Sequence, residues 1–111
     1  MPFDQYHEPA NELSQEIRSF ARMIMSMIEE ADAIDWYEQR MSVEQDQEAK
    51  AIMQDAQQEE FKHFAMDLEW LLRRKPKWRV AVEGIVGKQG DIVANAKEAE
   101  EREDKAPEGL S

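Results

Sequence analysis

Apolar residues recur every three or four positions through the first third of the chain, which is the repeat of one face of an α-helix. Asn11 precedes the first of them and is able to cap the amino end of a helix. The pattern therefore predicts a long helix that begins near Asn11 and turns an apolar face towards a partner. The positions on this face are Leu13, Ile17, Phe20, Ile24, Met27, Ala31 and Ile34.

The repeat lapses at residues 41–47, and a second helical pattern follows with Ser42 and Asp46 as rival caps for its first turn. The basic residues just before Pro76 suit the negative end of a helix macrodipole, and proline cannot easily continue a helix. We expect the second helix to end near Arg74. Its inward positions, which are partly polar, are Ile52, Ala56, Glu60, His63, Asp67 and Trp70.

The two patterns together predict an antiparallel two-helix hairpin. Each helix of roughly 28 residues would be about 42 Å long at 1.5 Å per residue, so two helices alone would leave much of their apolar stripes uncovered. A short apolar segment around Trp78 comes next, and a short C-terminal helix is expected from about Asp91. Between them, a break is expected at Gly84, Gly87 and Gly90. No strand-like alternation is long enough to indicate a strand, and the predicted fold class is all-α.

The length and acidity of the chain narrow its organisation and its partners. A chain of 111 residues fits one domain, which we place at residues 1–97, with an acidic, disordered tail at 98–111. The formal net charge of -11 repels phosphate backbones and anionic lipids, so we expect neither nucleic acid nor a membrane as partner. Cations suit such a surface. The alternative is an acidic surface that only confers solubility.

The absence of cysteine excludes disulfide scaffolds, thiolate metal sites and cysteine nucleophiles. No apolar run approaches the ~20 residues that cross a bilayer. The first residues, Met1–Asp4, lack the basic-then-apolar layout of a secretion signal. These features together predict a cytoplasmic protein.

A Glu-x-x-His sequence, Glu60 to His63, places a carboxylate and an imidazole one turn apart on the inward face of the second helix. Glu30 lies beside the apolar stripe of the first helix and complements them. Oxygen and nitrogen ligands without sulfur suit iron or manganese, with zinc as a substitute. A chance Glu-x-x-His is common, so the pattern leaves open a metal site and a coincidence.

A ferritin-like di-iron site needs two single glutamates and two Glu-x-x-His pairs. This chain has one such pair, because its other histidine, His7, has no glutamate at the required spacing. A two-fold dimer would supply two copies each of Glu30, Glu60 and His63, which is the full set of ligands. It would also complete a four-helix bundle. The incomplete set of metal ligands and the uncovered apolar stripes therefore both predict a homodimer.

Three blocks of sequence, residues 29–40, 59–63 and 66–71, closely resemble the encapsulated ferritins. These are half-ferritins whose two-helix subunits pair to form a ferroxidase centre. The resemblance extends from His7 to about Ala96. It implies that each subunit contributes three ligands to a di-iron centre: Glu30, Glu60 and His63.

The resemblance implies further functional positions near these ligands. Trp36 and Tyr37 would lie behind them in the dimer interface, with a redox role for Tyr37 as an alternative to simple packing. An outer metal site on the path of iron would fall on Glu29 and Asp32. The family pattern has glutamate where Asp32 stands, which puts the affinity of this outer site in question.

The implied function is oxidation of Fe(II) to Fe(III) by dioxygen or peroxide for iron mineralisation and storage. Iron is the expected metal, with manganese, zinc or calcium as substitutes. The family also implies a ring of dimers inside an encapsulin shell, although residues 105–111 show only a Gly-Leu-Ser remnant of a docking peptide. Two alternatives stay open: a non-catalytic helical dimerisation protein, and a di-iron or di-manganese oxidase of a small molecule.

Overall fold

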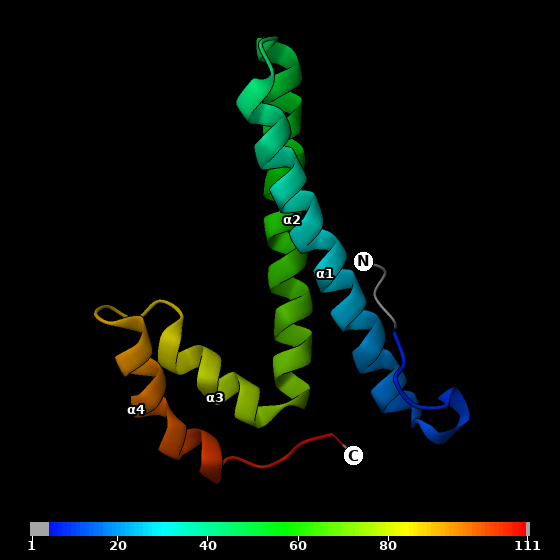
Figure 1. Ribbon diagram of the computed structural model, residues 1–111, viewed down its shortest axis with the longest axis vertical. Helices are drawn as coiled ribbons and strands as arrows, with labels where there is room; N and C mark the ends of the chain where they lie inside the picture. The colour runs from blue at the N-terminus through cyan, green and yellow to red at the C-terminus, as the bar shows by residue number, and fades with distance from the viewer. Residues whose placement is uncertain (1–4, 111) are drawn as a thin grey trace. The chain divides into compact units, whose positions relative to one another are not determined.

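The computed structural model describes residues 5–110, and all of the regular secondary structure over that range is helical (Figure 1). The all-α prediction is confirmed. The elements are a short 3-10 helix at Ala10–Glu12, then α1 (Gln15–Val43), α2 (Gln47–Arg74), α3 (Pro76–Ile85) and α4 (Ile92–Lys105). The chain divides into two compact units, Met1–Glu69 and Trp70–Ser111. Met1–Asp4, where a secretion signal was sought, and Ser111 of the Gly-Leu-Ser sequence lie outside the described residues.

Helix α1 begins later than predicted, because Ser14 and not Asn11 is its cap. The Ser14 hydroxyl accepts a hydrogen bond from the backbone N–H of Ile17 at 3.1 Å. Asn11 lies instead in the 3-10 helix, which Leu13 ends in an extended conformation. The guanidinium of Arg18 donates to the carbonyl of Ala10 and ties this turn to α1. Both residue types are good caps, and the structure uses Ser14.

The start of α2 is settled in favour of Asp46. Its carboxylate accepts a hydrogen bond from the N–H of Ala49 at 2.8 Å. The rival residue Ser42 still belongs to α1, where its hydroxyl donates to the carbonyl of Gln39 at 2.6 Å. The predicted end at Arg74 is confirmed, and Pro76 opens α3 at a position where a missing N–H costs nothing.

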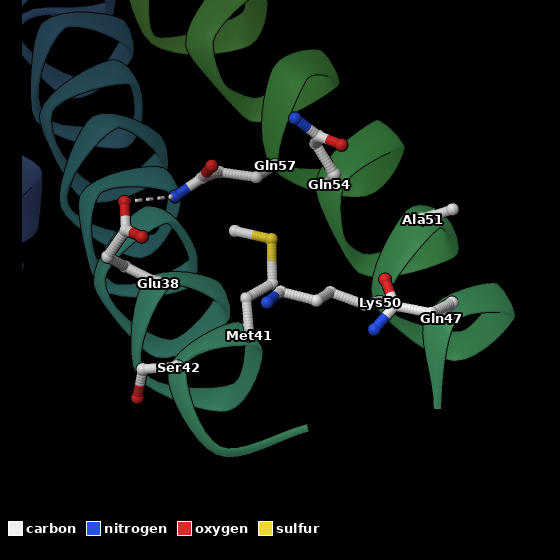
Figure 2. Close-up of a pocket in the computed structure, with 8 residues that line it drawn as sticks. All are labelled: Glu38, Met41, Ser42, Gln47, Lys50, Ala51, Gln54 and Gln57. Atoms are coloured by element: carbon white, nitrogen blue, oxygen red, sulfur yellow. Dashed lines mark hydrogen bonds between the residues drawn. The ribbon is translucent and has the colours of Figure 1, made fainter. Parts of the chain in front are cut away.

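In the unit Met1–Glu69, α1 and α2 form the predicted antiparallel hairpin (Figure 1). A buried amide connects the two helices. Gln57, which is 6% exposed, donates from Nε2 to the carbonyl of Ile34 at 3.1 Å. It also donates to the Glu38 carboxylate at 3.4 Å (Figure 2). Beside it lies an open hollow of about 540 Å³. Its lining is mainly polar: Glu38, Met41, Ser42, Gln47, Lys50, Ala51, Gln54 and Gln57.

The hairpin buries little apolar surface by itself. Among the described residues of this unit, Met41 is the one apolar side chain that is buried. Ile52, which the sequence placed on the inward face of α2, is 66% exposed within one chain, whereas the polar Gln57 is buried against α1. The large apolar side chains that remain exposed in this unit are Trp36, Val43, Ile52, Phe61 and Met66.

The unit Trp70–Ser111 has a denser core, around the fully buried Leu71. Helices α3 and α4 pack closely where Gly84 meets Ala99, since a Cβ added at Gly84 would lie 2.5 Å from the Ala99 Cβ. The predicted helix break at Gly84 is therefore wrong: this glycine lies inside α3 and is there for helix packing. The chain turns at Gly87 and Gly90, whose φ angles are +78° and +95°.

Helix α4 begins after Asp91, as predicted, and the Asp91 carboxylate accepts from the N–H of Ala94 at 2.8 Å. It continues to Lys105, so the first eight residues of the tail predicted to be disordered are helical. The reason is a contact outside the helix, because Lys77 donates to the carbonyls of Glu103 at 3.3 Å and Asp104 at 3.0 Å. The Glu103 carbonyl also accepts from the N–H of the cap residue Ala106 at 3.1 Å, so Lys77 adds a second donor to this last turn, whose carbonyls lack the usual partners of a helix interior.

Beyond α4 the chain returns to the start of α3. Lys75 donates to the carbonyl of Glu108 at 3.0 Å, and Lys77 lies 3.8 Å from the Glu108 carboxylate. None of the described helices has the length and apolar character of a membrane span.

Candidate metal centre

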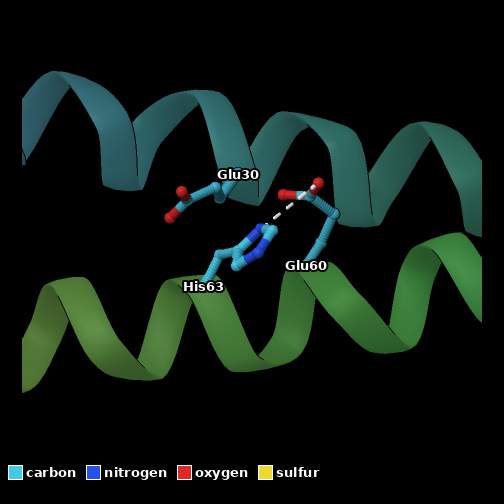
Figure 3. Close-up of side chains that lie close together, drawn as sticks. All are labelled: Glu30, Glu60 and His63. Atoms are coloured by element: carbon cyan, nitrogen blue, oxygen red, sulfur yellow. Dashed lines mark ion pairs between the residues drawn. The ribbon is translucent and has the colours of Figure 1, made fainter.

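Three potential metal ligands come together between the two helices of the hairpin (Figure 3). Glu30 comes from α1, and Glu60 and His63 come from adjacent turns of α2. Each offers one ligand atom, and these atoms all lie within 4.8 Å of one another. We call these three residues the cluster. Helical spacing puts Glu60 and His63 on one face, and the antiparallel pairing of the helices places Glu30 opposite them.

The cluster is partly buried and still accessible to ions. The Glu60 side chain is 24% exposed and the His63 side chain 45%, with 3.7 Å between His63 Nδ1 and Glu60 Oε1. A hollow of about 300 Å³ opens at this point. Its lining is small, polar or charged: Ser26, Glu29, Glu30, Ala33, Glu60 and His63. An apolar substrate would find few apolar contacts in this hollow within one chain.

The electrostatics of Glu30 fit a site for a cation. Burial raises the pKa of Glu30 to about 7, helped by a hydrogen bond to Asp67 and by the charges of Asp67, Glu60 and Glu29. Its buried Oε2 has no hydrogen-bond donor. A bound cation would compensate this collected negative charge and complete the coordination of an oxygen that lacks a donor. The residues present therefore fit a divalent metal.

The raised pKa predicts that the Glu30 carboxyl in the metal-free protein titrates near pH 7 and not near 4.5. A divalent metal binds the carboxylate form of Glu30, so the affinity of the cluster for the metal should rise as pH increases through 7. The folded pKa lies above the unfolded value, so the stability contributed by the protonated form is present below about pH 4.5 and is lost as pH rises to about 7. The measurement is the ¹³C chemical shift of the Glu30 carboxyl between pH 4 and 9.

Glu29→Gln is the control for this titration. It removes the last-named of the charges that raise the pKa of Glu30, so the midpoint should fall only slightly. A parent midpoint near 4.5 would contradict the electrostatic description.

The other residues predicted from sequence lie outside the cluster. Glu29 is exposed and lines the hollow, whereas Asp32 is exposed and is not among the lining residues. Trp36 is 53% exposed. The ring of Tyr37 lies under the guanidinium of Arg40, 5.4 Å from Cζ to the ring centre. Within one chain the structure does not place Asp32, Trp36 or Tyr37 in the cluster.

One residue was not singled out from the sequence. Asp67 is only 9% exposed and is hydrogen-bonded to Glu30. It follows His63 by four residues, so it lies on the same face of α2. An aspartate on an otherwise inward stripe was the available signal.

Similar proteins share the region that holds the cluster. The EncFtn-like family matches residues 5–89. A ferritin-like protein from Thermotoga maritima is 43% identical over 79 residues, which cover 71% of this chain and 69% of that protein. An encapsulated ferritin-like protein from Rhodospirillum rubrum is 40% identical over 88 residues, which are 79% of this chain and 63%, less than two thirds, of that protein.

A solved structure agrees with the fold. The crystal structure of a protein from Nitrosomonas europaea has a TM-score of 0.76 and 39% sequence identity, and the match covers 80% of this chain and 99% of the other. The resemblance drawn from the sequence blocks is thereby confirmed over the region of α1, α2 and α3. The chain belongs to the EncFtn-like family of encapsulated ferritin-like proteins.

Proposed function

We propose that this protein is a ferroxidase that oxidises Fe(II) to Fe(III) at a di-iron centre shared by two copies of the chain. The observation that carries the proposal is the convergence of Glu30, Glu60 and His63 from two helices to within 4.8 Å. Two carboxylates and an imidazole are hard or borderline donors, which suit both oxidation states of iron. The family membership supports handling of iron.

A di-iron centre needs more ligands than one copy of the chain supplies, and two copies would supply them. One cluster holds three ligand residues, and a two-fold pair brings six, including both Glu-x-x-His sequences. The same pairing would cover exposed apolar side chains of the hairpin such as Trp36, Phe61 and Met66. The result would be a four-helix bundle, and a ring of such dimers would follow the family.

In the proposed reaction, Fe(II) is the substrate. Two Fe(II) ions each give one electron to dioxygen, which takes up two protons and leaves as hydrogen peroxide. Hydrogen peroxide can serve as the oxidant instead: it accepts the two electrons and two protons and leaves as two water molecules. Glu30 and Glu60 supply the negative charge that favours the higher oxidation state, and His63 supplies a neutral nitrogen donor. Exposed Glu29 and Asp32 offer acidic groups for incoming ions, and Tyr37 is a candidate for electron transfer.

The proposed setting is iron mineralisation and storage inside an encapsulin shell in the cytoplasm. The name of the Rhodospirillum rubrum relative, an encapsulated ferritin-like protein, supports this setting. Iron, the expected metal, could be replaced in vitro by manganese or zinc, which accept oxygen and nitrogen donors, or by calcium, which would bind the carboxylate oxygens.

The test compares Glu60→Gln with Glu59→Gln, two neighbouring substitutions that each remove one carboxylate and keep the size of the side chain. Glu59 pairs with Lys62 on the exposed side of α2, so its variant should oxidise Fe(II) like the parent. Glu60→Gln should lower the oxidation rate to the protein-free rate. Fe(II) is added anaerobically, air is admitted, and Fe(III) absorbance is followed in the near ultraviolet.

Rates equal to the protein-free blank for all three proteins would reject the ferroxidase. They would favour the non-catalytic dimerisation protein.

A further inference from the structure

The last described residues of the chain fold back on the junction between α2 and α3. We call residues 106–110 the strap and residues 74–77 the elbow. The strap follows α4 and contacts the elbow where Lys75 donates to the Glu108 carbonyl at 3.0 Å (Figure 1). The family match ends at residue 89, so the elbow lies inside it and the strap outside it. This contact therefore needs an explanation apart from the metal centre.

Charge attracts the strap to the elbow at Glu108. The Glu108 carboxylate lies 3.5 Å from Lys75 Nζ and 3.8 Å from Lys77 Nζ. The Glu108 side chain is 77% exposed, and both lysine side chains are partly exposed. Ion pairs this accessible to solvent contribute little to stability, and salt screens them further. Glu108 can therefore leave the lysines at little cost, and most easily at high ionic strength.

Shape fits the strap to the elbow at Gly109. Its φ angle is +87°, which favours glycine. A Cβ added here would collide with the Arg74 carbonyl oxygen and would lie 2.7 Å from Pro76 Cδ. Gly90 has a similar φ angle of +95°, but a Cβ added there would meet nothing within 4 Å. The elbow thus accepts a glycine next to an acidic residue, and a larger side chain at Gly109 would hold the strap away.

Helix α4 is held against α3 independently of the strap. Lys77 donates to the carbonyls of Glu103 at 3.3 Å and Asp104 at 3.0 Å, which belong to the last turn of α4. Gly84 of α3 also packs directly against Ala99, which is 1% exposed. The strap can therefore separate from the elbow while α4 stays folded and in place.

We propose that the strap is a reversible latch on the elbow, closed by the charge of Glu108 and by the close fit of Gly109. In the closed state the strap occupies Lys75 and Lys77. In the open state it frees both lysines, on a chain whose formal net charge is -11. The latch thus controls whether this basic surface and the strap are available to other molecules. The inference is independent of the proposed ferroxidase.

The test measures the mobility of the strap in the full-length, metal-free protein labelled with ¹⁵N. Backbone order parameters of Glu108, Gly109 and Leu110 are compared at about 0.01 M and about 1 M NaCl, between which the Debye length falls from about 30 Å to about 3 Å. A rigid backbone has an order parameter of about 0.85, and a flexible one lies below about 0.6. The order parameters of α4 are the internal reference.

We expect the strap of the parent to be rigid at the lower salt concentration and flexible at the higher one, while α4 stays rigid at both. Glu108→Gln should lose most of this salt dependence, because the amide carries no charge. Glu100→Gln, at an exposed position of α4, should behave like the parent. Equal strap mobility at both salt concentrations in the parent would overturn the latch, and so would a Glu108→Gln variant that responds to salt like the parent.

A pair of glycine substitutions tests the close fit. Gly109→Ala should leave the strap flexible even at the lower salt concentration, because the added Cβ collides with the elbow. Gly90→Ala adds a methyl group at a similar φ angle in open space, so its strap should stay rigid under that condition. A rigid strap in Gly109→Ala would refute the proposed fit. Equal loss of order in the two variants would do the same, since a general loss of stability in this unit would then explain both.

Discussion

His63→Ala should lower the affinity for Co²⁺ by more than the roughly 100-fold that marks the upper range for loss of an outer-shell partner. His63 is the only nitrogen donor in the cluster, and its loss leaves the carboxyls of Glu30 and Glu60 beside Asp67 without a neutral ligand. If two chains share the metal, binding must also favour the dimer by mass action. Sedimentation velocity with and without Co²⁺ should show a metal-dependent shift to dimer in the parent and none in His63→Ala.

The chain offers a matched control in its other histidine. His7 is exposed, lies in the same unit and belongs to no group of potential metal ligands found among the described residues. His7→Ala should bind Co²⁺ and dimerise like the parent. Equal metal-dependent dimerisation in the His63 and His7 variants would show that the cluster does not bridge two chains.

Leu71→Ala should have the largest effect on stability. Leu71 is 0% exposed and is the largest fully buried side chain of the described chain. Replacing a buried leucine by alanine typically costs about 2–5 kcal/mol, through lost burial and the cavity left behind. The free energy of unfolding, measured by urea denaturation at fixed protein concentration, should fall by that amount. Fixed concentration matters because association also contributes to stability.

Val86→Ala is the control for this loss, because Val86 lies in the same unit and is 68% exposed. It should change the free energy of unfolding by less than about 0.5 kcal/mol. Similar losses in the two variants would mean that the buried environment of Leu71 does not determine its contribution.

Local signals were enough to predict two of the element boundaries. The end of α2 at Arg74 follows from Pro76, and the start of α4 follows from Asp91, since proline and a capping carboxylate act within one turn of the backbone. The choice of Ser14 over Asn11 and the role of Gly84 were not accessible in this way. Gly84 depends on Ala99, a residue of the next helix, and a single sequence does not show that contact.

In the candidate site, too, local spacing predicted some residues, and others depended on contacts between helices. Helical spacing put Glu60 and His63 on one face and set Glu30 beside the facing stripe, and the structure brings all three together. The same stripe contained Asp67, but the sequence did not show that Asp67 lies beside Glu30. Which residue of α1 faces Asp67 depends on how far the two helices are displaced along each other, and helical periodicity says nothing about that displacement.

The buried amide of Gln57 has a consequence for that displacement. If α2 slid along α1 by one turn, about 5.4 Å, Gln57 would be taken away from the carbonyl of Ile34 and left without its partner. An unsatisfied buried polar group costs about 1–3 kcal/mol, whereas partly exposed apolar residues could exchange neighbours at little cost. The same slip would shift Glu30 by about 5.4 Å along the helix axis relative to Glu60 and His63, whereas the ligand atoms of all three now lie within 4.8 Å of one another. Gln57 thus favours the present register of the two helices. In that register Glu30 of α1 lies opposite Glu60 and His63 of α2.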